Sequence, residues 1–200
     1  MSERPILMNT DMVRAILEGR KTVTRRVVKL KYENTHLEMR TDKYGTGLIE
    51  VQNEEPGVTT VKKPDGTTTR RLLAYIEKEP PYKSGDILWV RETWAQPATH
   101  IFWYKADIPE KNILWRPSIH MPRAAARIFL RVTDVRVERL QDCGNMQAKD
   151  EGCTCCSQFA RIWDSTIKPA DRATYGWDAN PWVWVISFER ISGEEAQHAT

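Results

Sequence analysis

Short apolar runs separated by polar turns dominate the hydrophobic pattern of the chain. Segments 5–8, 87–90, 101–104 and 182–188 are apolar or β-branched and have the length of strands. Residues 127–137 alternate apolar and charged positions, the period of a half-buried strand, before a turn expected at Thr133–Asp134. Several short strands with few helices predict an α+β fold, a small β-barrel with flanking helices.

Three other segments have features of helices. Apolar residues recur at helical intervals between 12 and 17, Asn9 or Thr10 supplies the N-cap, and Gly19 ends the helix. Two shorter helices are expected around 147–151 and 157–163. After Gly19, β-branched residues favour a strand, so the polar run 20–26 lies at a helix-to-strand junction.

Residues 31–83 are more polar and richer in turns than the rest of the chain. A turn at Lys63–Gly66 between two Thr-rich stretches predicts an inserted β-hairpin region. The apolar residues Leu73, Tyr75 and Ile76 are too few for an independent core. We therefore expect a single domain over 1–192 with 31–83 as an insertion, and a flexible tail over 193–200, which lacks apolar anchors.

Composition and charge narrow the class of protein. The chain has 200 residues, 40% hydrophobic and 28% charged, as in soluble globular proteins. No apolar run reaches the roughly 18 residues that cross a bilayer, and no signal peptide is visible, so we expect a cytoplasmic protein without a membrane partner. The net charge of +3 does not by itself imply polyanion binding. Basic residues at 20–31 and 62–71 form either an electropositive patch or a solvated face.

The four cysteines lie in one short stretch, at Cys143, Cys153, Cys155 and Cys156. Without a secretory signal they are expected to be reduced thiols. Structural zinc sites use pairs of ligands from separated segments, whereas three of these thiols fall within four residues. We therefore expect no metal and no cofactor.

The stretch Gly19–Arg26, which reads Gly-Arg-Lys-Thr-Val-Thr-Arg-Arg after a capped helix, resembles the G-x-K-T-x-T-x-R signature of the ASCH domain. Segments 85–94, 115–123 and 177–185 resemble the longer, phage-associated branch of that family. The resemblance covers most of the chain except 31–83 and the tail. It implies a PUA-like β-barrel, and PUA-like barrels generally bind RNA. Some small ASCH proteins are instead amidohydrolases that remove the acyl group from N4-acetylcytidine.

The resemblance also assigns residues. In those amidohydrolases the catalytic residues are a Lys and a Thr of the signature and a Glu in a later helix, which match Lys21, Thr24 and Glu151. The placement of Glu151 rests on the step Asp150-Glu151-Gly152, although Cys143–Met146 replaces the acidic residues that usually precede it.

Amide hydrolysis requires a nucleophile, a base, and donors for the developing oxyanion. Thr24 is the candidate nucleophile. Lys21 is a base at neutral pH only if burial or the neighbouring arginines lower its pKa. If Glu151 instead pairs closely with Lys21, Glu151 activates Thr24 or a water and Lys21 stabilises negative charge. The sequence leaves both assignments of the roles of Lys21 and Glu151 open.

Candidate substrate-binding residues are aromatic, basic or polar, because a ring stacks on a flat base while an Arg or His reads its edge. They are Arg26, Arg91, Glu92, Trp94, Trp115, Arg116 and His120. Each has a structural alternative: the tryptophans as core, Arg91 and Glu92 as a salt bridge, His120 as a loop residue.

Three functions follow from this reasoning. The leading hypothesis is an amidohydrolase acting on N4-acylated cytosine or cytidine, with a small-molecule nucleoside or nucleobase as its partner. The second is a non-catalytic RNA-binding module. A ribonuclease is third, because no His pair or carboxylate cluster suited to phosphodiester cleavage is evident.

Overall fold

A computed structural model describes residues 2–32, 35–42, 45–52, 59–62, 68–71, 76–108, 110 and 112–198. The chain divides into two compact units. The first comprises Met1–Arg26 and Pro81–Thr200, and the second comprises Val27–Pro80. We describe each unit by itself.

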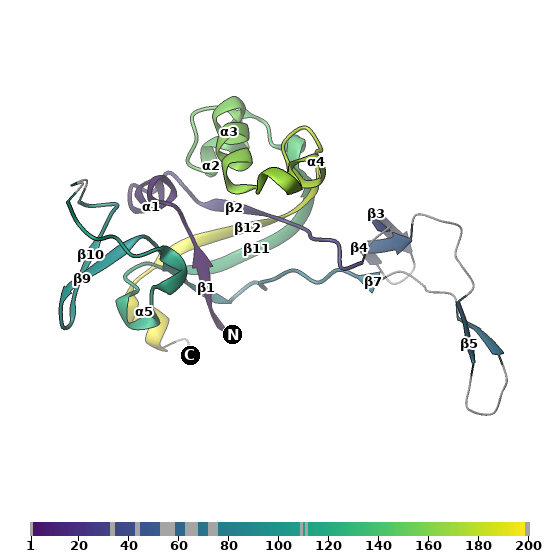
Figure 1. The fold of residues 1–200 in the computed structure, drawn as a ribbon, viewed down its shortest axis with the longest axis horizontal. Helices are drawn as coiled ribbons and strands as arrows, with labels where there is room; N and C mark the ends of the chain where they lie inside the picture. Colours follow the sequence, from purple (N-terminus) through teal and green to yellow (C-terminus); the bar gives the residue numbers. More distant parts are fainter. Residues whose placement is uncertain are drawn as a thin grey trace. The chain divides into compact units, whose positions relative to one another are not determined.

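A five-stranded sheet forms the centre of the first unit, in the order β1-β8-β11-β12-β2 (Figure 1). The strands are β1 (Glu3–Leu7), β2 (Val23–Val27), β8 (Ile87–Arg91), β11 (Phe129–Arg139) and β12 (Trp182–Ile191). β1 pairs with β8 in parallel, whereas β11 is antiparallel to both β8 and β12. The strands expected near 5–8, 87–90, 127–137 and 182–188 are therefore confirmed, and the fold is of the α+β class.

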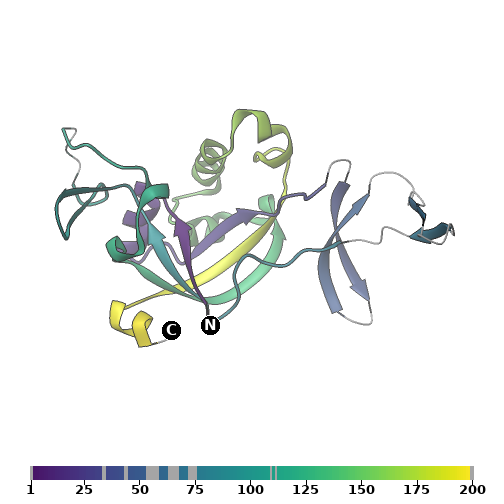
Figure 2. The same ribbon diagram turned by 60° about the horizontal axis from the view of Figure 1, so that its bottom comes forward.

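Helices and a hairpin surround this sheet (Figures 1 and 2). The α-helices of the unit are α1 (Thr10–Leu17), α2 (Asn145–Asp150), α3 (Cys156–Thr166), α4 (Arg172–Tyr175) and α5 (Gly193–His198). Short 3-10 turns cover Ser118–His120, Arg123–Ala125, Leu140–Asp142 and Pro169–Asp171. The hairpin consists of β9 (Trp94–Ala98) and β10 (Ile101–Tyr104). Within the described residues, no helix is both long and apolar enough to cross a membrane.

The boundaries of α1 are those expected from local sequence signals. The Asn9 side chain accepts a hydrogen bond from the Met12 backbone N–H at 2.8 Å, which caps the first turn. Gly19 adopts a left-handed φ of +73° just after the helix, a conformation that costs a glycine little. The chain therefore turns back into β2 within a few residues.

The hydrophobic core lies on the central strands. Leu88 of β8 is opposite Leu130 of β11, and both side chains are fully buried. The sequence pattern predicts a core of nine apolar residues, of which Leu17 alone is half-buried and the other eight are buried: Ile6, Leu88, Val90, Ile128, Leu130, Val132, Val185 and Phe188. The buried face of α1 is formed instead by Val13, Ala15 and Ile16.

Leu88→Ala is expected to lower the free energy of unfolding by about 2–5 kcal/mol, because it removes buried methyl groups and leaves a cavity. Urea denaturation measures this loss. Leu114, which is 89% exposed, provides the matched control, since Leu114→Ala removes the same atoms from the surface. A change in Leu88→Ala below about 0.5 kcal/mol would contradict the burial of this strand.

Two expectations about the strands and the C-terminus were wrong. β11 does not end in a turn at Thr133–Asp134 but continues, with a shift of register between Val132 and Asp134. Val132 is opposite Phe188 and Asp134 is opposite Ser187, so Thr133 is an extra residue in β11, as in a β-bulge. Residues 193–198 are not a flexible tail but form α5, in which Ala196 is fully buried against Ile87, Phe129 and Ile191. Ala196 is the small apolar anchor that sequence reasoning overlooked.

The second unit covers most of the predicted insertion. It contains a sheet of β3 (Thr35–Asp42), β4 (Gly45–Gln52) and β7 (Ile76–Glu77), and a hairpin of β5 (Thr59–Lys62) and β6 (Thr68–Arg71). The turn expected at 63–66 and the residues Leu73 and Tyr75 lie outside the described residues. The hydrophobic core of this unit uses Leu48 and Ile49, which were not considered. The chain thus has two compact units where one domain was expected.

A buried carboxylate organises the second unit. Glu50 is 3% exposed and accepts hydrogen bonds from the Lys31 and Tyr32 backbone N–H groups and from the Thr35 hydroxyl at 2.6 Å. It also pairs with Lys78. Burial raises the pKa of Glu50, but these partners more than offset burial and hold the pKa at about 2. The side chains of 62–71 are outside the described part, so a joint basic patch with 20–31 stays a prediction.

Candidate active site

The predicted catalytic lysine is held where α1 turns into β2. Lys21 and Arg20 both direct their backbone N–H groups to the carbonyl oxygen of Ala15, at 3.0 and 2.8 Å. Lys21 also forms an isolated antiparallel bridge with Glu151, the residue that follows α2. The turn at Gly19 therefore brings together two residues that are 130 positions apart.

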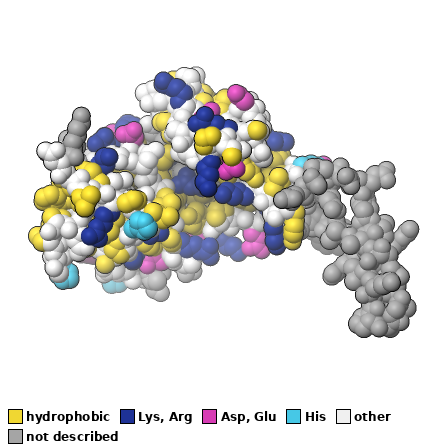
Figure 3. Space-filling view, viewed as in Figure 1, with side chains coloured by type: hydrophobic (Ala, Val, Ile, Leu, Met, Phe, Trp, Pro, Cys, Tyr) yellow, Lys and Arg dark blue, Asp and Glu magenta, His cyan; other side chains and the backbone are white. Residues whose placement is uncertain are grey.

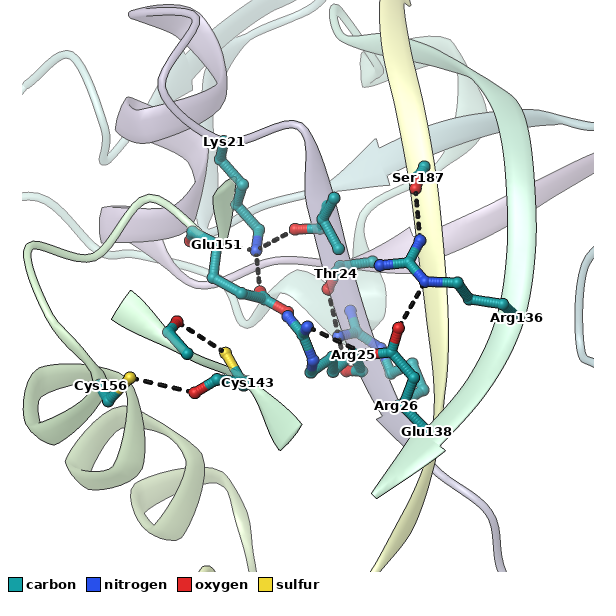
Figure 4. A network of polar contacts seen from close by, with 12 residues as sticks. Lys21, Thr24, Arg25, Arg26, Arg136, Glu138, Cys143, Glu151, Cys156 and Ser187 are labelled. Carbon is teal, nitrogen blue, oxygen red and sulfur yellow. Dashed lines mark hydrogen bonds and ion pairs between the residues drawn. The ribbon is translucent and has the colours of Figure 1, made fainter. Parts of the chain in front are cut away.

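The ammonium group of Lys21 is enclosed, and its side chain has no exposed surface. It donates to the Glu151 carboxylate at 2.5 Å, to the Val23 carbonyl at 2.7 Å and to the Glu151 carbonyl at 3.2 Å (Figure 4). These three bonds use every donor of a charged lysine. Burial lowers the pKa of Lys21, Glu151 acts in the opposite direction, and the nearby Arg26 adds to the lowering.

The second oxygen of the Glu151 carboxylate pairs with Arg25. The distance is 3.2 Å, and the side chains of both residues are almost fully buried. Arg25 also lies 3.5 Å from Glu138 and over the ring of Phe159, 5.7 Å from its centre. Glu151 is thus fixed between two cations, Lys21 and Arg25.

Thr24 lies on β2 in the same region, and it is fully buried. Its hydroxyl oxygen accepts a hydrogen bond from Arg26 at 2.7 Å (Figure 4). Arg26 also donates to the carbonyls of Arg25 and Leu7, both at 2.9 Å. A guanidinium cannot accept a proton, so Arg26 positions Thr24 without serving as its base.

Gly152 allows α1 to approach the segment that carries Glu151. It has a φ of +83°, and a Cβ at this position would lie 2.6 Å from the Cβ of Ala15. Arg20 further ties the two segments by donating to the carbonyl of Gly152 at 2.9 Å. A side chain at 152 would therefore disturb both Lys21 and Glu151.

The other predicted binding residues lie around Met121, in a second cluster. Arg91 donates to the Met121 carbonyl at 3.1 Å and lies over the ring of Trp89. Trp94 packs in one apolar group with Met121. Trp115, Arg116 and His120 belong to the segment that leads to Met121, and Arg116 forms a bridge with Trp94.

Within this second cluster the carboxylate of Glu92 is engaged in a salt bridge. Glu92 is 1% exposed and pairs in a bidentate manner with Arg127, at 2.9 and 3.0 Å. Arg127 also pairs with Asp107 and lies 3.9 Å from the ring centre of Tyr104. Burial raises the pKa of Glu92, while Arg127 opposes that rise. Glu92 therefore forms a salt bridge, the structural alternative named for it above, and its partner is Arg127.

The remaining side chains of this cluster differ in exposure. Trp94 is 3% exposed, with the guanidinium of Arg116 5.2 Å from its ring centre, so it serves as core. Trp115 is half-buried and donates to the Glu110 carbonyl at 3.4 Å. Arg116 and His120 are exposed. The structure therefore pairs Lys21 with Glu151 and Arg26 with Thr24, and it groups the other six candidates elsewhere.

The thiols and carboxylates form no metal centre in the described part of the chain, where no group of three or more His, Cys, Asp or Glu residues is placed to hold an ion. All four cysteines are free. Burial raises the pKa of Cys143 to about 11, and the Cys156 thiol donates to the Cys143 carbonyl at 3.0 Å. The expectation of a metal-free protein stays a prediction.

Sequence reasoning missed the structural importance of Arg25. It considered Arg25 only as a cation that lowers the pKa of Lys21, whereas the structure pairs Arg25 with Glu151. A signal was present, because residues two apart share a face of a strand, so Val23 and Arg25 point to one side and Thr24 and Arg26 to the other. Arg25, which pairs with Glu151, therefore lies on the opposite face of β2 from Arg26, which donates to Thr24.

Comparison of the chain with models of protein families, with curated proteins and with solved structures found no match.

Proposed function

We propose that this protein is an amidohydrolase that removes the acyl group from N4-acylated cytosine or cytidine. The observation that carries the proposal is the buried Lys21–Glu151 pair, at the two positions that the ASCH resemblance assigns to catalysis. Burying an ion pair is rarely favourable for stability alone, and strongly perturbed ionisable groups cluster at functional sites. Lys21 satisfies that criterion, because burial lowers its pKa.

The contacts of Lys21 favour one of the two role assignments. An ammonium that donates to a carboxylate at 2.5 Å is held in its charged form and is a poor base. In the proposed reaction Glu151 takes the proton of the attacking hydroxyl, from Thr24 or water. The hydroxyl oxygen then bonds to the acyl carbon, and Lys21, whose donors are already bonded, stabilises the oxyanion through its positive charge. The bond between the acyl carbon and N4 breaks, and the proton passes to N4. If Thr24 is the attacking group, a water gives a proton to Glu151 and attacks the resulting ester, which releases the acid and returns the proton to the Thr24 hydroxyl.

The proposal includes closure of the sheet into a PUA-like barrel. β1 and β2 are the two edge strands of the five-stranded sheet. Arg26 of β2 donates to the carbonyl of Leu7, at the end of β1, at 2.9 Å. A side chain that bridges the two edges supports closure, which removes exposed strand edges.

A non-catalytic module for RNA or a nucleobase is the second candidate, and the burial of Thr24 favours it. A nucleophile with no exposed surface requires an opening of the site before substrate can reach it. Lys and Arg side chains also gather on one face of the first unit, beneath α2–α4 (Figure 3). Such a face would attract phosphates with a strong dependence on salt.

Incubation of the protein with N4-acetylcytidine, followed by separation of the products, tests the proposal. We expect cytidine and acetate in equal amounts, produced by the wild type and by Lys149→Ala, which removes an exposed lysine from α2. A short RNA is titrated in parallel at low and physiological salt. Absence of turnover together with RNA binding that persists at physiological salt would reject the enzyme in favour of the module.

A further inference from the structure

Four thiols gather around the start of α3, beside the segment that carries Glu151. Cys155 is the N-cap of α3, Cys156 begins the helix, and Cys153 lies two residues before the N-cap. Cys143 precedes α2, and the Cys156 thiol donates to the Cys143 carbonyl at 3.0 Å (Figure 4). The proposed hydrolysis uses none of these four thiols.

Cys155 combines exposure to solvent with a stabilised thiolate. It is half-buried, whereas Cys143 and Cys153 are 2% and 7% exposed. Its sulfur lies 3.1 Å from the Ser157 hydroxyl, and this contact more than any other lowers the pKa of Cys155 to about 7. About half of the Cys155 side chains are therefore deprotonated at neutral pH, and the thiolate is the nucleophilic form of cysteine.

Cys153 is the thiol that is best placed to react with an oxidised Cys155. Residues two apart span at most about 7 Å, and the chain bends at Thr154, so the two Cα atoms fall within the separation that disulfides require. Cys156 is a poorer partner, because neighbouring Cα atoms are about 3.8 Å apart, which is closer than a disulfide favours. Burial raises the pKa of Cys153, so Cys155 is oxidised first.

We propose that peroxides oxidise Cys155, that Cys155 then forms a disulfide with Cys153, and that this disulfide controls the Lys21–Glu151 pair. The Cys155 thiolate attacks one oxygen of hydrogen peroxide, the O–O bond breaks, and the departing hydroxide takes up the proton that the thiol had released. The Cys153 sulfur attacks the sulfur of the resulting sulfenic acid, and the S–O bond breaks. The oxygen leaves as water with the proton of Cys153. The two thiols lose two electrons, and peroxide is reduced to two waters.

Oxidation at Cys153 reaches the candidate active site through Gly152. A Cβ at position 152 would lie 2.6 Å from the Cβ of Ala15, so this segment fits closely against α1. The disulfide draws the buried sulfur of Cys153 outwards, and the adjoining residues Gly152 and Glu151 must move with it. Glu151 then loses its position at 2.5 Å from Lys21. An effect on hydrolysis rests on the proposed function, whereas the disulfide itself does not.

Peptide mass spectrometry on the full chain tests the disulfide. At pH 7, iodoacetamide should alkylate Cys155 at least about tenfold faster than the other three thiols. After hydrogen peroxide, the peptide 150–161 should lose two hydrogen atoms in the wild type and in the control Cys156→Ser, and dithiothreitol should reverse the loss. Cys153→Ser should stop at a sulfenic acid on Cys155, which dimedone traps. Cys155→Ser should give neither product.

Two further measurements test the control of the Lys21–Glu151 pair. The Thr22 backbone N–H donates to the Asp150 carbonyl at 2.8 Å, so it reports on the contact between these segments. Oxidation of the wild type should accelerate its exchange with deuterium at least about tenfold. Hydrolysis of N4-acetylcytidine should fall at least about tenfold and return with dithiothreitol. Cys155→Ser should keep its rate in peroxide, which also controls for oxidation of methionines.

The outcomes separate this inference from the proposed function. Hydrolysis at an unchanged rate by protein that carries the disulfide would overturn the control of the pair and leave the enzyme intact. Absence of hydrolysis by the reduced wild type, with exchange at Thr22 that oxidation accelerates, would retain the control and reject the enzyme. Equal alkylation rates for the four thiols, or a peroxide-induced link between Cys143 and Cys156 that persists in Cys155→Ser, would overturn the assignment of Cys155.

Discussion

Lys21→Ala is expected to abolish N4-acetylcytidine hydrolysis and to lower the free energy of unfolding by about 3–5 kcal/mol. The loss of stability follows from the burial of the pair, because the alanine leaves the Glu151 carboxylate with Arg25 as its remaining ion-pair partner at 3.2 Å. Urea denaturation and product analysis on the same sample give both quantities. Lys149→Ala, at an exposed lysine, should change neither.

A double variant distinguishes a lost ion pair from a general disturbance. Lys21→Met combined with Glu151→Leu removes both members of the pair, so the loss of stability in the double variant should be smaller than the sum of the losses in the two single variants, although Arg25 then loses its carboxylate partner at 3.2 Å. The free energies of unfolding of the two single variants and the double variant give the coupling free energy between Lys21 and Glu151. A Lys21→Ala variant within about 0.5 kcal/mol of the wild type would contradict the burial of this pair.

The pH dependence of the rate assigns the role of Lys21. Burial lowers the pKa of Lys21 from its ordinary value of 10.5. If the charged ammonium stabilises the oxyanion, kcat falls as the pH rises through this lowered pKa. If neutral Lys21 is the base, kcat rises through the same pKa, which is the opposite sign. We expect the fall, measured from neutral pH to about pH 10 on protein that stays folded.

Local signals made part of the fold and of the site predictable. The Asn9 cap, the Gly19 turn and the β-branched run after it depend on neighbouring residues, and the structure reproduces them. The junction that carries Lys21 and Thr24 follows from those elements. Proximity of Glu151 to Lys21 did not follow from sequence patterns, because 130 positions separate the two residues. The resemblance supplied that pairing.

Packing between distant segments explains what sequence reasoning missed. Ala196 is too small to stand out in a hydropathy pattern, yet it is fully buried in the fold. The pairing of Glu92 with Arg127 depends on how β8 approaches the start of β11. Trp94 looked like a stacking residue, but burial to 3% exposure makes it part of the core. In each case the deciding partner is distant along the chain.

Thr24→Ala is expected to lower kcat for N4-acetylcytidine by at least about 1,000-fold, because it removes the proposed nucleophile. The fold should persist, since the variant loses one buried hydrogen bond, from Arg26, at a cost of about 1 kcal/mol. Thr24→Ser is the matched control, because it keeps the hydroxyl and should retain most of the activity. Mass spectrometry of rapidly quenched wild type should reveal an acyl group on Thr24, and none in Thr24→Ala.

A combination of variants decides between Thr24 and a water as the attacking group. If Glu151 activates Thr24, the two residues act as one unit, so Thr24→Ala combined with Glu151→Gln should be no slower than the slower single variant. If Glu151 activates a water, Thr24 only lines the site, so the loss of rate should come from Glu151→Gln alone. The water mechanism also predicts that folded Thr24→Ala turns over at a rate close to that of the wild type. Such a result, without an acyl group on the wild type, would reject the covalent mechanism and leave Glu151 and Lys21 as the catalytic pair.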